Sequence, residues 1–137
     1  MLKVFVYGTL KPGKPNYCRY CEGKIIGLRE ATARGQLFYL PQLGYPAMMR
    51  GEGSVRGVVL HFEDAAILRV LDELEDFKPD RPPEENEYNR TKVEVFDLTK
   101  RPLGWVWTYT MFPEKIHELG GVPLVSGEWE PGMFPVP

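Results

Sequence analysis

The chain of 137 residues is 43% hydrophobic and 26% charged, and its formal net charge is −2. This length predicts a single domain, residues 1–137, whose core needs no disulfide. The near-neutral charge and the lack of a long basic run argue against nucleic acid or an acidic membrane surface as a main partner. No apolar run approaches the roughly 18 residues of a membrane span, and the N-terminus lacks a signal-peptide pattern. We therefore expect a cytoplasmic protein.

The first stretch of the chain, residues 2–7, predicts a short buried strand that ends abruptly at Gly8. Val, Phe and Tyr favour an extended backbone, and Pro12 and Gly13 prevent the strand from resuming. A strand that runs into a glycine leaves several backbone N–H groups without a ladder partner, and such a cluster can hold an anion such as a ligand carboxylate. The alternative is an ordinary tight turn, and the first stretch alone leaves both open.

The two cysteines form a single Cys-x-x-Cys, Cys18 and Cys21. A zinc site would need a second such pair or well-spaced histidines, whereas His61 and His117 are isolated. We interpret the cysteines as reduced thiols on a short helical turn that begins near Asn16. We expect no metal and no cofactor.

Further elements follow from the spacing of apolar residues. Strands are predicted at 31–40, 45–49, 55–62, 88–98 and 103–111, and helices at 64–77 and 113–119. The Gly51–Gly53 segment is interpreted as a hairpin-like break between the second and third of these strands. Because strands and helices do not alternate regularly, a doubly wound sheet is disfavoured. The pattern predicts an α+β fold with a small closed or nearly closed mixed sheet flanked by helices.

The predicted helix at 64–77 carries several acids, and its helical wheel separates them. One arc is apolar and consists of Ile67, Leu68, Val70, Leu71 and Leu74. Glu73 and Asp76 point away from this arc and Asp72 lies at its edge, but Glu75 projects between apolar side chains. Burial raises the pKa of a carboxylate, which suits a group that takes and returns a proton near neutral pH. Alternatively, Glu75 bends out to water or pairs with Arg90.

The polar stretch from Lys78 to Glu87 contains three prolines and predicts a surface loop long enough to act as a mobile lid. The sequence contains no Gly-x-Ser-x-Gly elbow and no Gly-x4-Gly-Lys phosphate-binding loop, and its two scattered histidines disfavour a Ser-His-Asp triad. The aromatic residues Trp105, Trp107 and Tyr109 lack interleaved basic residues, so they predict core and pocket wall in preference to a base-stacking surface.

Residues 6–13, Val-Tyr-Gly-Thr-Leu-Lys-Pro-Gly, resemble the opening signature of the gamma-glutamylcyclotransferase-like family, which includes the plant AIG2-like proteins and the gamma-glutamylamine cyclotransferases. Three further blocks resemble this family in the same order: 35–39 with 45–47, 71–75, and 88–90 with Val93 and Val95. Together they span about residues 4 to 113.

The resemblance implies a small mixed β-barrel flanked by helices and a small-molecule gamma-glutamyl substrate. The backbone N–H groups of the first turn would hold the substrate α-carboxylate, and Glu75 would be the catalytic acid/base. The implied substrate-binding residues are Tyr7, Gly8, Thr9, Leu10, Tyr45, Trp107 and Tyr109. The implied reaction is attack of the substrate α-amine on its own γ-carbonyl, which yields 5-oxoproline and a free amine without a cofactor.

Two features depart from the family pattern: Asp76 stands where glycine is frequent and is followed by the long Lys78–Glu87 loop, and Trp107 stands where tyrosine is common. Both affect the expected shape of the leaving-group pocket. A protein that keeps the fold only to bind a small ligand or a partner protein is the alternative. The sequence leaves open the leaving amine, a role in glutathione breakdown and the oligomeric state.

Overall fold

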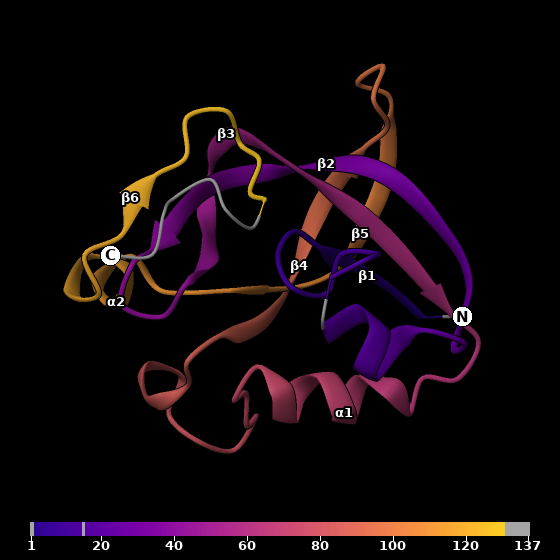
Figure 1. The fold of residues 1–137 in the computed structure, drawn as a ribbon, viewed down its shortest axis with the longest axis horizontal. Helices are drawn as coiled ribbons and strands as arrows, with labels where there is room; N and C mark the ends of the chain where they lie inside the picture. The colour runs from indigo at the N-terminus through magenta and orange to yellow at the C-terminus, as the bar shows by residue number, and fades with distance from the viewer. Residues whose placement is uncertain (1, 15, 131–137) are drawn as a thin grey trace.

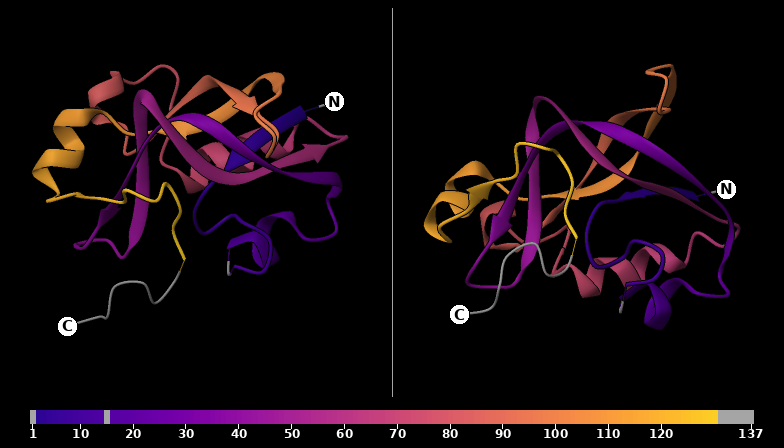
Figure 2. Two further views of the ribbon diagram at one scale, coloured as in Figure 1. Left: turned by 90° about the horizontal axis from the view of Figure 1, so that it is seen from above. Right: turned by 45° about the horizontal axis from the view of Figure 1, so that its top comes forward.

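The computed structural model describes residues 2–14 and 16–130. Its elements are β1 (Leu2–Val6), a π-helical turn (Tyr17–Cys21), β2 (Ile25–Leu40), β3 (Tyr45–Phe62), α1 (Ile67–Leu74), a 3-10 turn (Pro83–Glu85), β4 (Asn89–Phe96), β5 (Pro102–Thr110), α2 (Pro113–Glu118) and β6 (Val122–Pro123). The helix α1 lies along one side of the strands, and α2 lies at one end beside β6 (Figures 1 and 2).

The strand pairings close on themselves. The order in the sheet is β3-β1-β5-β4-β2-β6, and β2 also pairs with β3. The β1–β5 pair is parallel, whereas β1–β3, β2–β3, β2–β4 and β4–β5 are antiparallel. This arrangement confirms the prediction of an α+β fold with a mixed sheet and few helices.

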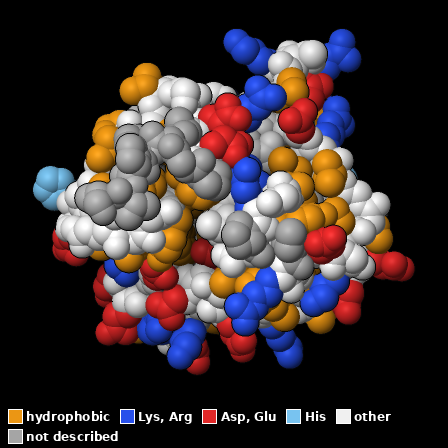
Figure 3. All heavy atoms as spheres, viewed as in Figure 1, with side chains coloured by type: hydrophobic (Ala, Val, Ile, Leu, Met, Phe, Trp, Pro, Cys, Tyr) orange, Lys and Arg blue, Asp and Glu red, His pale blue; other side chains and the backbone are white. Residues whose placement is uncertain are grey.

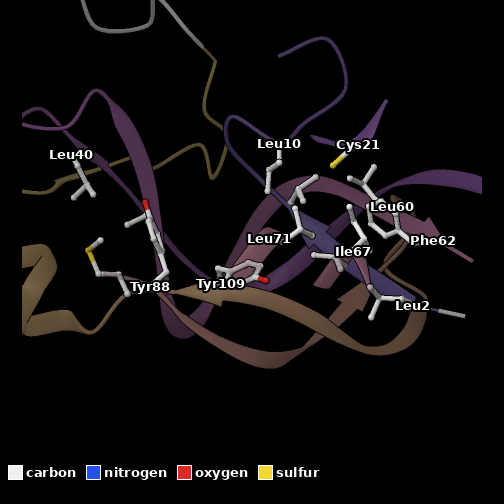
Figure 4. Close-up of a cluster of buried hydrophobic side chains, with 14 of the residues drawn as sticks. Leu2, Leu10, Cys21, Leu40, Leu60, Phe62, Ile67, Leu71, Tyr88 and Tyr109 are labelled. Carbon is white, nitrogen blue, oxygen red and sulfur yellow. The ribbon is translucent and has the colours of Figure 1, made fainter. Parts of the chain in front are cut away.

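Alternation along β1 divides the buried side chains between two clusters. Val4 and Val6 face the cluster beneath α1, whereas Phe5 belongs to a second cluster that includes Val95 and Val106. Figure 4 shows the first cluster, in which the α1 residues Ile67 and Leu71 lie among Leu2, Leu60 and Phe62. The first strand is therefore packed on both faces, and the loop that follows it begins from a fixed position.

The predicted break at Gly51–Gly53 is wrong, because β3 continues through it as one strand. The strand β2 shifts register between Arg34 and Gln36 at this point. A Cβ on Gly53 would lie 2.8 Å from the Gly35 carbonyl oxygen, and a Cβ on Gly51 would lie 2.9 Å from Cγ of Gln36. These glycines allow close approach of two paired strands at a bulge, which a single sequence does not distinguish from a turn.

Other elements differ from prediction mainly at their ends. The strand β2 begins at Ile25, before the predicted residue 31, and α1 is shorter than the predicted 64–77.

Cys21 is a free, buried thiol, and burial raises its pKa to about 11. The side chain of Cys18 lies outside the described part. In residues 2–14 and 16–130, no helix has the length and apolar character needed to cross a membrane.

Candidate functional site

A cavity of about 160 Å³ opens where the loop after β1 meets the end of α1 and the start of β3. Its lining comes from residues 5–10, 45–46, 74–75 and 87–88, together with Asn16 and Tyr109. The face seen in Figure 3 carries charged side chains of both signs and is hollowed near its centre. The cavity therefore gathers side chains from segments far apart in the sequence.

In the loop after β1, backbone carbonyl groups accept hydrogen bonds from nearby N–H groups. The Gly8 carbonyl accepts from the Lys11 N–H at 3.0 Å, and the Thr9 carbonyl accepts from the Tyr17 N–H at 3.2 Å. The Asn16 side-chain amide also donates to Oγ1 of Thr9 at 2.7 Å, and the Asn16 side chain makes no capping hydrogen bond to the π-helical turn that follows it. Within residues 2–14 and 16–130, the N–H groups of residues 8–10 donate to no backbone acceptor. They remain available to a ligand in the cavity.

Gly8 has a steric reason to be glycine. A Cβ at this position would lie 3.1 Å from Cγ and 3.3 Å from Cδ of Pro46, which lines the same cavity. A side chain here would push the loop and β3 apart.

The loop is also tied to the C-terminal segment. The buried Lys11 ammonium donates to the Trp129 carbonyl at 2.6 Å and to Oε1 of Glu130 at 3.0 Å, and Lys14 pairs with Oε2 of Glu130 at 2.6 Å. Trp129 is only 4% exposed and packs in the second cluster. Two residues more than a hundred positions further along the chain thus hold the loop.

Glu75 is the C-cap of α1 and lines the cavity. Its N–H donates to the Leu71 carbonyl at 2.9 Å, and its carbonyl accepts from the Tyr88 N–H at 3.3 Å. Burial, with a smaller contribution from the negative charge of Glu87, raises the pKa of Glu75 to about 8. A carboxyl group with this pKa exchanges protons readily near neutral pH.

Arg90 does not pair with Glu75. Its Nη1 lies 2.5 Å from Oδ2 of Asp72, and the Tyr109 hydroxyl donates to Oδ1 of the same carboxylate at 2.7 Å. Asp72, at the edge of the apolar arc, therefore neutralises Arg90 and leaves the Glu75 carboxylate without that cation.

Asp76 adopts a left-handed conformation with φ of 56°. This is the position just after a helix C-cap, where glycine is favoured because it has no Cβ. Arg81 donates to the Asp76 carbonyl at 2.6 Å and lies 3.1 Å from its carboxylate. The aspartate thus occupies a position that glycine frequently fills at helix ends, and Arg81 holds it there.

Tyrosine hydroxyls supply most of the remaining polar groups around the cavity. Tyr7 donates to the Tyr109 carbonyl at 2.6 Å, and Tyr88 donates to the Pro46 carbonyl at 2.7 Å. The Tyr45 hydroxyl donates to Oε1 of Glu87. Burial raises the pKa of each of these tyrosines, so all three remain neutral donors at physiological pH.

Of the site residues expected from the sequence, the cavity brings together Tyr7, Gly8, Thr9, Leu10, Tyr45, Glu75 and Tyr109. Trp107 is not among the residues that line it. Although Trp107 and Tyr109 share one face of β5, the Trp107 ring lies beside the Arg90 guanidinium at 5.0 Å and the Lys92 ammonium at 4.6 Å. These two cations of β4 occupy the space next to the indole.

Sequence reasoning did not identify Asn86 and Glu87 as site residues. Asn86 is 2% exposed, and its Oδ1 accepts from the Lys78 N–H at 3.1 Å and from Nε of Arg81 at 2.6 Å. The Asn86 carbonyl accepts from the Lys115 ammonium at 2.7 Å. The loop predicted as a mobile lid is thus anchored just before Glu87 enters the cavity. Both residues lie in the Lys78–Glu87 loop, which the sequence associates with the leaving-group pocket as a whole, but this segment has no periodicity that would single out either residue.

Replacing Asn86 with alanine is expected to lower the free energy of unfolding by about 1–3 kcal/mol, because the donors on Lys78 and Arg81 lose their acceptor. Urea unfolding of the variant and the parent protein measures this loss. Asp80→Ala, an exposed change in the same loop, is the matched control. Equal stability of the Asn86 and Asp80 variants would contradict the anchoring role.

Comparison with known proteins identifies the family. The model of the family described as Gamma-glutamyl cyclotransferase, AIG2-like matches residues 4–131. The chain belongs to this family.

Two curated relatives and one solved structure illustrate the similarity. A Vibrio cholerae protein named as a candidate gamma-glutamylcyclotransferase is 32% identical over 92% of this chain and 93% of its own. The gamma-L-glutamyl-butirosin B gamma-glutamyl cyclotransferase of Niallia circulans is 30% identical over 80% of this chain and 67% of its own. The crystal structure of a mouse AIG2-like protein has 27% identity and a TM-score of 0.63, covering 83% of this chain and 81% of its own.

Proposed function

We propose that this protein converts a gamma-glutamyl amine or gamma-glutamyl peptide into 5-oxoproline and a free amine. The observation that carries the proposal is Glu75, a carboxyl group with a pKa of about 8 in a cavity that also holds a loop with available N–H groups. Membership of the gamma-glutamyl cyclotransferase family supports the same reaction class.

In the proposed complex, the N–H groups of residues 7–10 bind the substrate α-carboxylate. Several backbone N–H groups that converge at the end of a strand form a favourable anion site. The α-ammonium then lies toward Glu75, and the leaving side extends past Tyr45 and Tyr109. Trp107 lies outside the cavity, and we assign it no contact with the substrate.

The Glu75 carboxylate takes a proton from the substrate α-ammonium, and the resulting amine attacks the γ-carbonyl carbon. A carbon–nitrogen bond forms to close the five-membered ring. The bond from the γ-carbon to the leaving nitrogen breaks as Glu75 returns the first proton to that nitrogen. The ring nitrogen then gives its second proton to the released amine, which departs as an ammonium ion, and Glu75 is again a carboxylate. Because the nucleophile belongs to the substrate, the reaction needs no cofactor, and holding the chain in its reactive conformation contributes much of the acceleration.

The pH dependence of kcat/KM is expected to follow the Glu75 carboxyl. The base must be ionised in the free enzyme, so kcat/KM rises with pH and levels off above a pKa of about 8. Initial rates measured across this range test the expectation, with the substrate amine titrated separately by NMR so that its own ionisation can be subtracted. A corrected profile that is flat between about pH 5 and 9 would exclude Glu75 as the base.

The direct test is incubation with gamma-glutamyl amines and gamma-glutamyl dipeptides, followed by detection of 5-oxoproline. The competing function is a binding protein that keeps the cavity but not the chemistry. That function predicts no 5-oxoproline from any gamma-glutamyl compound, together with a rise in melting temperature when one of them is added.

A further inference from the structure

A second carboxylate, that of Glu87, lines the cavity with Glu75. The two are close enough for the charge of Glu87 to raise the pKa of Glu75. Glu87 is half-buried, and it is supplied by the polar loop and not by the helix that carries Glu75. The proposed reaction uses only Glu75, so Glu87 is a titratable group in the cavity without an assigned role.

Neither carboxylate has a cationic partner in the part of the chain that the structure describes. Residues 5–10, 16, 45–46, 74–75, 87–88 and 109 line the cavity, and none of them is Lys, Arg or His. None of the ion pairs among the described residues includes Glu75 or Glu87. By contrast, nearby Asp72 pairs with Arg90. Withdrawing an uncompensated carboxylate from water, even in part, is unfavourable, so the cavity is suited to a ligand that brings positive charge.

The Glu87 carboxylate is also held in place. Its neighbour Asn86 is anchored to Lys78, Arg81 and Lys115, and the Tyr45 hydroxyl occupies Oε1 of Glu87. No hydrogen bond to Oε2 occurs among residues 2–14 and 16–130. One oxygen is therefore fixed by the protein, and the other is free to accept from a ligand.

The charges of a gamma-glutamyl substrate do not satisfy both carboxylates. The gamma-glutamyl unit carries one α-carboxylate, assigned to the loop after β1, and one α-ammonium, assigned to Glu75. Glu87 is then left without a cation unless the leaving amine provides one. A leaving group with its own carboxylate would face Glu87 with like charge, which is unfavourable.

We propose that Glu87 is a specificity-determining residue that selects gamma-glutamyl conjugates whose leaving amine carries a second, positively charged amino group. The proposal rests on the proposed function, because it names the substrate class of the same cavity. A gamma-glutamyl diamine is the simplest member of that class.

Three substrates whose leaving groups each have four carbons test the selection: the gamma-glutamyl conjugates of 1,4-diaminobutane, butylamine and 4-aminobutanoate, whose far ends are cationic, neutral and anionic. We expect kcat/KM to fall by about tenfold at each step in that order, as for the loss of one charged hydrogen bond. Glu87→Gln is expected to remove the difference between the cationic and neutral substrates. Glu85→Gln, an exposed change in the same loop, is expected to keep the full preference.

Two outcomes would overturn the selection by Glu87. One is equal kcat/KM for all three conjugates in the parent protein. The other is a Glu87→Gln variant that loses activity equally toward all three, because this would assign Glu87 to the shared gamma-glutamyl ammonium or to folding.

Failure of the proposed function is a separate result. If none of the conjugates yields 5-oxoproline, the proposed reaction is refuted. The Kd values of the same conjugates then still test whether Glu87 selects the cationic one. Tighter binding of the cationic conjugate that disappears in Glu87→Gln supports the charge selection, and equal Kd values exclude it.

Discussion

Replacing Glu75 with glutamine is expected to reduce 5-oxoproline formation by about 10²–10⁴-fold, the range typical for the loss of a positioned acid–base group. Glutamine keeps the size of the side chain but neither accepts the ammonium proton nor returns one to the leaving nitrogen. The matched control is Glu73→Gln, which changes an exposed residue of the same helix. This control is expected to keep the activity of the parent protein. A Glu75→Gln variant as active as this control would refute the assignment.

The same variant has a stability signature that does not depend on substrate. In the folded protein the Glu75 pKa is raised from 4.5 to about 8, so the folded state holds its proton more tightly than the unfolded state does. The free energy of unfolding therefore falls as pH rises from about 4.5 to about 8. Glutamine has no such proton, so Glu75→Gln should gain stability relative to the parent protein over this range. Urea unfolding at several pH values measures the difference, and a pH-independent difference would contradict the raised pKa.

Replacing Gly57 with alanine is expected to destabilise the fold by about 3 kcal/mol or more. An added Cβ would lie 2.2 Å from the Val6 carbonyl oxygen and 2.7 Å from Cζ of Phe5. The strand β1 is held between β3 and β5, so it has little freedom to move away. Because Val6 ends β1 immediately before the loop, the strain reaches the base of the candidate site.

Gly27→Ala is the control for this change, since its nearest atoms belong to His61 and lie 3.9 Å away. Its effect on the free energy of unfolding is expected to be within about 0.5 kcal/mol. Urea unfolding of the two variants compares them directly. Equal midpoints would show that β1 gives way to the added methyl group.

Local pattern was sufficient for the features that repeat along the chain. The extended stretch before Gly8 and the apolar arc that includes Leu71 are visible because side chains recur with the period of a strand or a helix. The same periodicity predicted that Glu75 lies on the apolar side of the helix, and in the structure Glu75 lines the cavity. The α+β class also followed, since the order of elements reflects their local periods.

The tertiary structure alone decided which distant groups meet. Arg90 pairs with Asp72 and not with Glu75, and Gly51 and Gly53 lie within one strand because β2 approaches them. Each choice depends on a partner remote in sequence, and a single sequence carries no signal for such pairs.

The position of the segment 78–87 likewise depends on tertiary contacts. Its composition predicts a polar loop, but the burial of Asn86 and the entry of Glu87 into the cavity depend on contacts with Lys115 and Tyr45. Sequence alone thus determined the fold class, the loop after β1 and the side of the helix that carries Glu75, because these follow from local backbone preference and periodicity. The presence of a second carboxylate, that of Glu87, in the cavity could not be predicted in this way. It depends on packing between segments that are distant in the sequence and show no periodic pattern.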